Sequence, residues 1–150
     1  MNNKINFVGI NRGFTLIELL VVIAIIGILS AIVTASLNTA RSKGATAAVY
    51  ATFHQIANQA AIYRASNSDF GKSVSSCGSG VFSDPIIQSA EVSILANSAS
   101  TAALSCYTDS TGNKWTISVS PLKTTTPASW CIDNSGNLGA KTANSDGTCH

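Results

Sequence analysis

A single glutamate, Glu18, stands near the start of an apolar run that extends from Phe14 to Ala35. This run is long enough to cross a bilayer, whose hydrocarbon core needs about 20 apolar residues in a helix. A carboxylate inside such a segment costs about 2.5–3.5 kcal/mol by insertion scales, so a span that only anchors has little reason to keep it. The chemistry that suits this acid is pairing of its charge with a cation on a partner.

The residues just upstream indicate where that cation comes from. Lys4 and Arg12 place positive charge before the apolar run, and Gly13 offers a protease a flexible residue at a cleavage point. Cleavage after Gly13 would make Phe14 a new N-terminus, with its amine near Glu18 in a first helical turn where the dipole favours an acid. Because burying both charges is costly, the pair is useful chiefly for choosing which chains associate. This favours assembly.

The stretch Gly13-Phe14-Thr15-Leu16-Ile17-Glu18, with the apolar residues after it, resembles the N-terminal methylation motif of type IV pilins and type II secretion pseudopilins. The resemblance implies a leader peptide, Met1 to Gly13, which a prepilin peptidase removes by cutting between Gly13 and Phe14. The same enzyme would N-methylate Phe14. The resemblance also implies that Glu18 neutralises the Phe14 amine of a neighbouring subunit during assembly.

Function and partners follow from the same resemblance. It implies a structural subunit of a type IV pilus-like extracellular filament, made as a single-pass protein of the inner membrane with its head outside the cytoplasm. The partners would be further copies or related subunits, the prepilin peptidase and methyltransferase, an ATP-driven assembly platform and, before assembly, inner-membrane lipid. A pseudopilin of a type II secretion system, in a periplasmic filament, is the alternative.

Two other interpretations of the apolar run remain open. An ordinary secretory signal peptide, cut after Ala31 or Ala35, would have an apolar region of about 7–15 residues, which is shorter than this run. An uncleaved anchor carrying an extracytoplasmic binding module fits the hydropathy, and only Glu18 speaks against it.

The composition agrees with a small structural protein. Charged residues make up 11% of the 150 residues, and the formal net charge is +2. Without Lys4 and Arg12 the basic and acidic side chains balance at seven each, so we expect no attraction to nucleic acid. No histidine stands beside a serine or cysteine in a catalytic motif, and the acids are scattered singly. The sequence therefore predicts no enzyme and no cofactor.

The helix is expected to continue beyond the span. The segment from Arg41 to Ala65 lacks proline and has apolar residues at steps of three and four, which predicts an amphipathic helix that buries one face. The residues of this face are Val49, Phe53, Ile56, Ala60 and Tyr63.

From Ser66 onward, short apolar pieces alternate with Ser, Gly and Asn clusters, which is typical of loops and short strands. Gly71 to Gly80 predicts a loop. Ser83-Asp84-Pro85 then opens a short helix, with a capping side chain and a proline in its first turn. The side of this helix expected to be buried consists of Ile87, Ala90, Ile94 and Leu95.

Three antiparallel strands are predicted after this helix. Leu104 to Thr108 and Lys114 to Ser120 would form a hairpin, and Ala128 to Asp133 would add a third strand. The middle strand alternates Trp115, Ile117 and Val119 with hydroxyl residues, which predicts one buried face and one solvated face.

The sequence thus predicts an α+β fold in which a long N-terminal helix packs on a small antiparallel sheet, as in pilins. The expected organisation is a leader at 1–13, a transmembrane and assembly helix at 14–36, its amphipathic continuation at 37–65, and a globular head at 66–150.

Four cysteines, Cys77, Cys106, Cys131 and Cys149, all follow the span, on the side that the positive leader assigns to the exterior. Four cysteines allow three pairings. We favour Cys77 with Cys106 and Cys131 with Cys149, because these pairs tie the loop before the short helix to a strand and the tail to the third strand. Zinc is the rival interpretation, but no CxxC pair occurs, so no metal site is expected.

Asp133, Ser135 and Asn137 have the spacing of the start of a calcium loop. The closing bidentate glutamate of such a loop is missing, so an Asx-rich turn is favoured. The absence of a recognisable calcium loop, together with the disulfide-bounded tail, favours a pilus over a pseudopilus.

Overall fold

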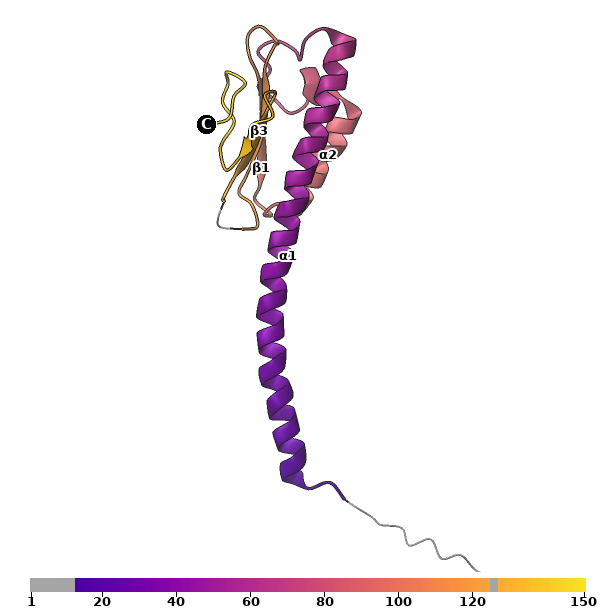
Figure 1. Cartoon of the computed structure of the whole chain (residues 1–150), viewed down its shortest axis with the longest axis vertical. Coiled ribbons are helices and arrows are strands. Elements are labelled where there is room, and N and C mark those ends of the chain that lie inside the picture. Colours follow the sequence, from indigo (N-terminus) through magenta and orange to yellow (C-terminus); the bar gives the residue numbers. More distant parts are fainter. Residues whose placement is uncertain (1–12, 125–126) are drawn as a thin grey trace, which may run out of the picture. The chain divides into compact units, whose positions relative to one another are not determined.

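The computed structural model describes residues 13–124 and 127–150. Apart from Gly13, the expected leader with Lys4 and Arg12 lies outside these residues. The chain divides into two compact units, Met1–Asn38 and Thr39–His150. The first helix, α1 (Leu16–Asn67), contributes residues to both units (Figure 1).

In the first unit, α1 is built mainly from leucine, isoleucine, valine and alanine. No proline interrupts it, and it passes through Gly27 and Ala35 as regular helix. The hydroxyl of Thr34 donates to the carbonyl oxygen of Ser30 at 2.8 Å, so this polar group is satisfied within the helix. The apolar side chains of this unit, from Leu16 to Leu37, are exposed.

In the second unit, α1 buries one face in the core. Its buried residues are Val49, Phe53, Ile56 and Ala60, which confirms the predicted stripe at these positions. Tyr63, the last predicted member, is partly buried against the same core. The spacing of three and four residues keeps these side chains on one side of the helix.

A 3₁₀ turn, η1 (Gly80–Ser83), precedes the second helix, α2 (Pro85–Asn97). The Asp84 carboxylate accepts from the backbone N–H groups of Ile86 and Ile87 at 2.9 and 3.3 Å, so the predicted capping side chain is that of Asp84. Gly80 has φ +58°, and a Cβ here would lie 2.6 Å from the carbonyl oxygen of Phe70. Only glycine fits this close approach.

The buried face of α2 differs from the prediction at one position. Ile87, Ala90 and Ile94 are buried as expected, but Leu95 is 39% exposed. Glu91 is buried instead. The prediction at Leu95 was wrong because hydrophobicity was used to choose the face, whereas the N-cap and the packing of Ile87 set the rotation of the helix.

The sheet has the order β1-β2-β3-β4, and every neighbouring pair is antiparallel. The strands are β1 (Ala103–Thr108), β2 (Trp115–Ser120), β3 (Trp130–Asp133) and β4 (Leu138–Gly139). The first three strands were predicted. The fourth was missed because its two residues are too few to show an alternating pattern.

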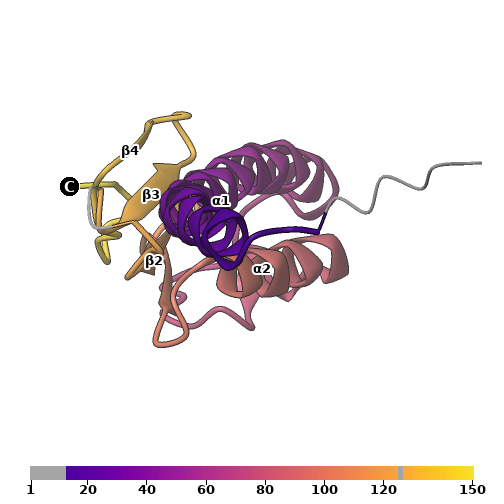
Figure 2. The ribbon, with the colours of Figure 1, turned by 90° about the horizontal axis from the view of Figure 1, so that it is seen from below.

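Within the second unit, α1 and α2 lie on the same side of the sheet (Figure 2). The core between helices and sheet is centred on Trp115, whose ring meets those of Phe70 and Phe82 edge-on at centroid distances of 6.4 Å each. Ile117 and Ile132, which are register partners on β2 and β3, are fully buried beside it.

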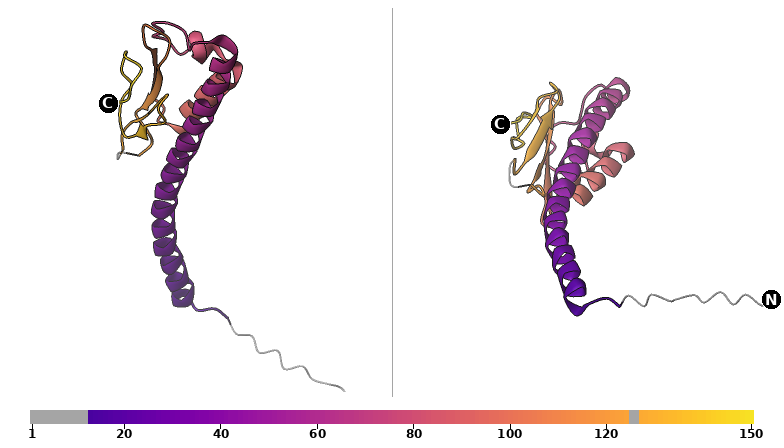
Figure 3. Two further views of the ribbon diagram at one scale, coloured as in Figure 1. Left: turned by 45° about the horizontal axis from the view of Figure 1, so that its top comes forward. Right: turned by 60° about the horizontal axis from the view of Figure 1, so that its bottom comes forward.

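The opposite face of the sheet is also covered. Residues 140–150 run across it, on the side away from the helices (Figure 3). As a result Thr116 and Ser118 are 0% and 5% exposed, so the prediction of a solvated face on this strand was wrong. Their hydroxyls are satisfied, because Thr116 donates to the Ile132 carbonyl oxygen at 3.1 Å and Ser118 accepts from Ala143 N–H at 3.2 Å.

Candidate functional site

The N-terminal end of α1 is fixed by a reciprocal pair of side chains. Thr15 donates from its backbone N–H and from its hydroxyl to Oε2 of Glu18, at 2.9 and 2.8 Å. In return the backbone N–H of Glu18 donates to the Thr15 hydroxyl oxygen at 3.3 Å. This is a capping box, which satisfies N–H groups that a helix start leaves without partners.

The role of Thr15 in the cap was not predicted from the sequence. The signal was present, because Thr-x-x-Glu directly before an apolar run is the signature of a capping box. It was overlooked because Glu18 was interpreted through the helix dipole and a partner on another chain, and not through hydrogen bonds within its own helix.

The cap leaves half of the carboxylate available. The three hydrogen bonds between Thr15 and Glu18 use Oε2, and none of the bonds found among the described residues uses Oε1. Together with Phe14, Ile17, Val21 and Val22, Glu18 lines a hollow on the helix surface. A cation that entered this hollow would meet an ionised oxygen beside apolar side chains.

The Gly13–Phe14 peptide bond lies just ahead of this cap. Both residues are exposed and lie outside the helix, which begins at Leu16. Nothing comes within 4 Å of where a Cβ on Gly13 would be. Exposed, non-helical backbone of this kind is where proteases act.

The helix beyond the cap is suited to a bilayer. Among the described residues, α1 is the one helix that is long and apolar enough to cross a membrane by length and composition. Glu18 is the only charged residue from Phe14 to Ala40. The site therefore combines an accessible bond, a capped carboxylate and an exposed apolar rod.

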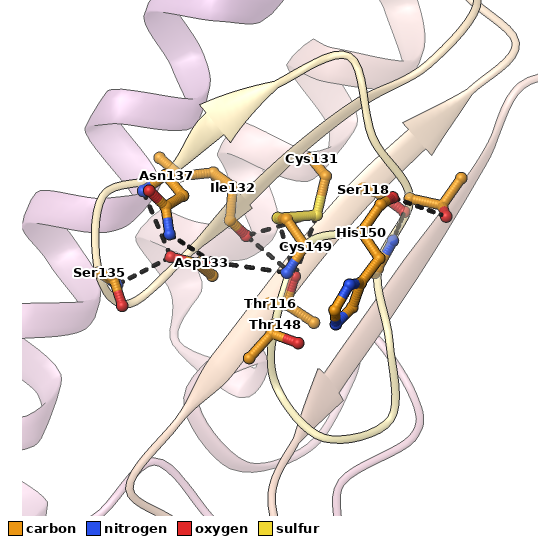
Figure 4. Close-up of a disulfide and its surroundings, with 12 residues drawn as sticks. Thr116, Ser118, Cys131, Ile132, Asp133, Ser135, Asn137, Thr148, Cys149 and His150 are labelled. Carbon is orange, nitrogen blue, oxygen red and sulfur yellow. Dashed lines mark hydrogen bonds between the residues drawn. A yellow bond between two sulfur atoms is a disulfide. The ribbon is translucent and has the colours of Figure 1, made fainter.

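In the head, two disulfides join Cys77 to Cys106 and Cys131 to Cys149, with Cα–Cα distances of 5.1 and 5.8 Å. These are the pairs favoured from the sequence. The second bridge fastens the tail to β3, and the hydroxyl oxygen of Thr116 lies 3.1 Å from the sulfur of Cys131 (Figure 4).

The turn after β3 is organised by Asp133, which is 3% exposed. Its carboxylate accepts from the N–H groups of Ser135 and Asn137 and from the side-chain amide of Asn137, at 2.9, 3.3 and 3.3 Å. It also accepts from Cys149 N–H at 3.4 Å (Figure 4). The N–H groups of Ser135 and Asn137 thus point toward the carboxylate, as in an Asx-turn.

A second group that the sequence analysis missed is Glu91 on α2. It is 7% exposed, and its Oε1 lies 3.8 Å from the sulfur of Cys106. Burial raises the pKa of this carboxyl to about 7. The signal was its position, because Ile87, Ala90, Glu91 and Ile94 have the spacing of one helix face.

Comparison with known proteins gives one match, and it covers the N-terminal site. Residues 10–34 match the family described as the prokaryotic N-terminal methylation motif, which is the signature of type IV pilins and pseudopilins. No curated protein and no solved structure matches the chain. The motif supports a precursor like those of type IV pilins and pseudopilins, indicates a structural protein, and fits an inner-membrane anchor.

Proposed function

We propose that the chain is the precursor of a structural subunit of a type IV pilus-like filament, assembled through its N-terminal helix. The observation that carries this proposal is the lone carboxylate of Glu18, which Thr15 holds at the tip of an exposed apolar rod, and whose Oε1 has no hydrogen bond within residues 13–124 and 127–150. A rod that served only as an anchor would not need the charge, because glutamine also completes a capping box and a charged residue in a span is costly.

Processing comes first. A prepilin peptidase cuts between Gly13 and Phe14 and methylates the new amine of Phe14. The exposure of both residues ahead of the helix supports this step. Until assembly the chain stays in the inner membrane with residues 14–36 across the lipid, the helix continuing over 37–65, and the head at 66–150 outside the cytoplasm.

Assembly then depends on charge rather than on hydrophobicity. Lipid and neighbouring helices are about equally apolar, so a helix gains little hydrophobic free energy when it leaves the bilayer for a bundle. An ATP-driven platform supplies the work. The Glu18 carboxylate of one copy accepts from the Phe14 ammonium of the next, which sets the stagger between them.

The cap on Glu18 suits this role. Thr15 restricts the carboxylate to the start of the helix, so less conformational entropy is lost when a second chain binds. Because the contact joins different surfaces of two copies and does not close on itself, repetition gives a helical polymer.

The test is the N-terminus of the natural product. Mass spectrometry of the membrane-extracted or filament-derived protein should show a chain that begins at N-methylated Phe14. An intact Met1 would overturn the proposal in favour of an uncleaved anchor for a binding module. A start beyond Ala31 would overturn it in favour of a secreted protein.

The cellular location of the filament distinguishes a type IV pilus from a type II secretion pseudopilus. A type IV pilus subunit should be sheared from the cell surface in polymeric form. A pseudopilin should remain in periplasmic polymers and be needed for export of other proteins, which would contradict the extracellular part of the proposal.

A further inference from the structure

The Cys77–Cys106 disulfide has an unusual neighbour. Sulfur atoms of both cysteines and a carboxylate oxygen of Glu91 all lie within 4.8 Å of one another. Cys106 is 2% exposed and Glu91 7% exposed, whereas Cys77 is only partly buried. An external reagent therefore reaches the sulfur of Cys77 more readily than that of Cys106.

In the part of the chain that the structure describes, no counter-charge explains the burial of Glu91. Its one recorded polar contact among the described residues is the 3.8 Å approach to Cys106, whose bridged sulfur carries no proton to donate. η1, which packs on α2, has no ionisable side chain. On β1, Tyr107 points to the opposite face from Cys106.

The ionisable side chains of the neighbouring segments make contacts other than with Glu91. Lys123 donates to the carbonyl oxygen of Ala96 on α2 at 3.2 Å. His54 packs on Tyr50, Arg64 lies over Phe70 and bonds to Asn113, and Asp69 accepts from Gly71. Lys72 forms no ion pair with Glu91 in the described part of the chain. Burial is the cause that raises the pKa of Glu91 to about 7.

We propose that Glu91 is the proton donor and acceptor for opening and closing the Cys77–Cys106 disulfide in the folded head, by exchange with an external thiol. This inference is independent of the proposed function, because it concerns a bridge remote in sequence from the assembly motif.

The opening step balances as follows. The thiolate of an external thiol attacks the sulfur of Cys77 and forms a mixed disulfide. The Cys77–Cys106 bond breaks, and its electron pair leaves on Cys106. The carboxylic acid of Glu91 gives its proton to this sulfur and becomes a carboxylate.

Closing is the reverse. The Glu91 carboxylate takes the proton of the Cys106 thiol, the sulfur attacks Cys77, and the external thiolate departs. The thiolate is the nucleophile in such exchange. Two adjacent anions in a buried site repel each other, so a single proton is shared between Glu91 and Cys106, and its transfer accompanies the exchange.

The second disulfide is an internal control. Cys131 and Cys149 are 0% and 6% exposed. Beside their sulfurs lies the hydroxyl of Thr116, at 3.1 and 3.4 Å. The nearby carboxylate of Asp133 is occupied by N–H donors. This bridge has no acid in the position that Glu91 holds.

The test uses the oxidised full chain in detergent micelles with glutathione as the external thiol. Samples are quenched with acid at intervals, alkylated and digested, so that mass spectrometry reports opening at each bridge separately. At about pH 6, Glu91→Gln should slow opening of Cys77–Cys106 by about tenfold or more, since general acids typically contribute at least this much. Opening of Cys131–Cys149 should not change.

The pH profile separates proton transfer from a structural effect. The wild-type rate constant, divided by the concentration of glutathione thiolate, should fall as the pH rises through about 7, and Glu91→Gln should show no such fall. Asp146→Asn removes an exposed carboxylate and should leave the Cys77–Cys106 rate unchanged. Equal slowing at both bridges, or a flat normalised wild-type profile from about pH 5.5 to 8.5, would overturn the proposal.

Discussion

Thr15 and Glu18 exchange hydrogen bonds in both directions at the start of α1, so one carboxylate both caps its own helix and offers an oxygen to a neighbour. These two tasks can be separated by substitution, because glutamine also fits the second position of a capping box.

Charge at position 18 is therefore predicted to matter more for assembly than the cap. Glu18→Gln keeps the cap geometry but removes the charge, and should lower the yield of sheared filaments about tenfold or more, since a loss of about 1.4 kcal/mol already weakens an association tenfold. Thr15→Val keeps the charge, weakens the helix start by about 0.5–2 kcal/mol, and should still assemble.

Thr15→Ser, which retains the hydroxyl, is the control for the variants Glu18→Gln and Thr15→Val. Membrane levels of all three variants should match those of the wild type by immunoblot. Normal filaments from Glu18→Gln would contradict the pairing mechanism, and equal loss in Glu18→Gln and Thr15→Val would assign the effect to the cap.

Removing the tail disulfide is predicted to release the outer cover of the sheet. The bridge spans 18 residues, for which loop-closure entropy gives about 3 kcal/mol. The double variant Cys131→Ser/Cys149→Ser should lower the free energy of unfolding by about this amount in urea titration. Hydrogen exchange should rise in residues 140–150. Unchanged protection there would show that the tail is held without the bridge.

Asp133 is predicted to be the most sensitive acid of the C-terminal region. Asp133→Ala leaves the buried Cys149 N–H and the N–H groups of Ser135 and Asn137 without their acceptor. It should lower the free energy of unfolding by about 2–3 kcal/mol. Asp146→Ala is the matched control, because the Asp146 side chain is 59% exposed, accepts from Thr148 N–H in a surface turn and lies 3.9 Å from the exposed His150. Stability is measured by thermal or urea unfolding. If both variants lowered the free energy of unfolding by similar amounts, the predicted difference between Asp133 and Asp146 would be refuted.

Burial of Glu91 predicts that the head loses stability as the pH rises. Its pKa is about 7 in the folded chain against an ordinary 4.5, so the folded state binds the extra proton between these values. The free energy of unfolding should fall by up to about 3 kcal/mol from pH 4.5 to 7 and then level off.

Glu91→Gln should remove this dependence. The variant should match the wild type near pH 4.5 and be more stable near pH 8, where the wild type holds a buried charge. Urea titrations at both pH values provide the measurement, and parallel pH profiles for the two proteins would show that Glu91 does not titrate in this range.

The features that could be predicted from the sequence are those with a local pattern. Val49, Phe53 and Ile56 repeat with the period of a helix, and Asp84 with Pro85 marks a helix start by side-chain chemistry alone. The apolar run after Glu18 is equally local, because its length and its one acid can be counted. For this reason α1, the start of α2 and the three longer strands were predicted.

The features that were not predicted depend on tertiary contacts between segments. Nothing within β2 states that residues 140–150 cover its second face, because that contact joins segments far apart in the sequence. β4 exists only through its pairing with β3 at Cys131 and Ile132. Glu91 was overlooked for a related reason, since an acid on an otherwise apolar helix face becomes informative only when its neighbours are known.

The covered second face of β2 changes which substitutions the head can accept. Thr116 and Ser118 resemble surface residues by type, yet each hydroxyl fills a specific place beneath residues 140–150. A saturation-mutagenesis profile along this strand should therefore lack the two-residue rhythm of an ordinary amphipathic strand, and most of its positions should be comparably intolerant. Redesign of the head for display of foreign peptides should leave β2 intact and begin at the exposed tip of the turn around Gly136.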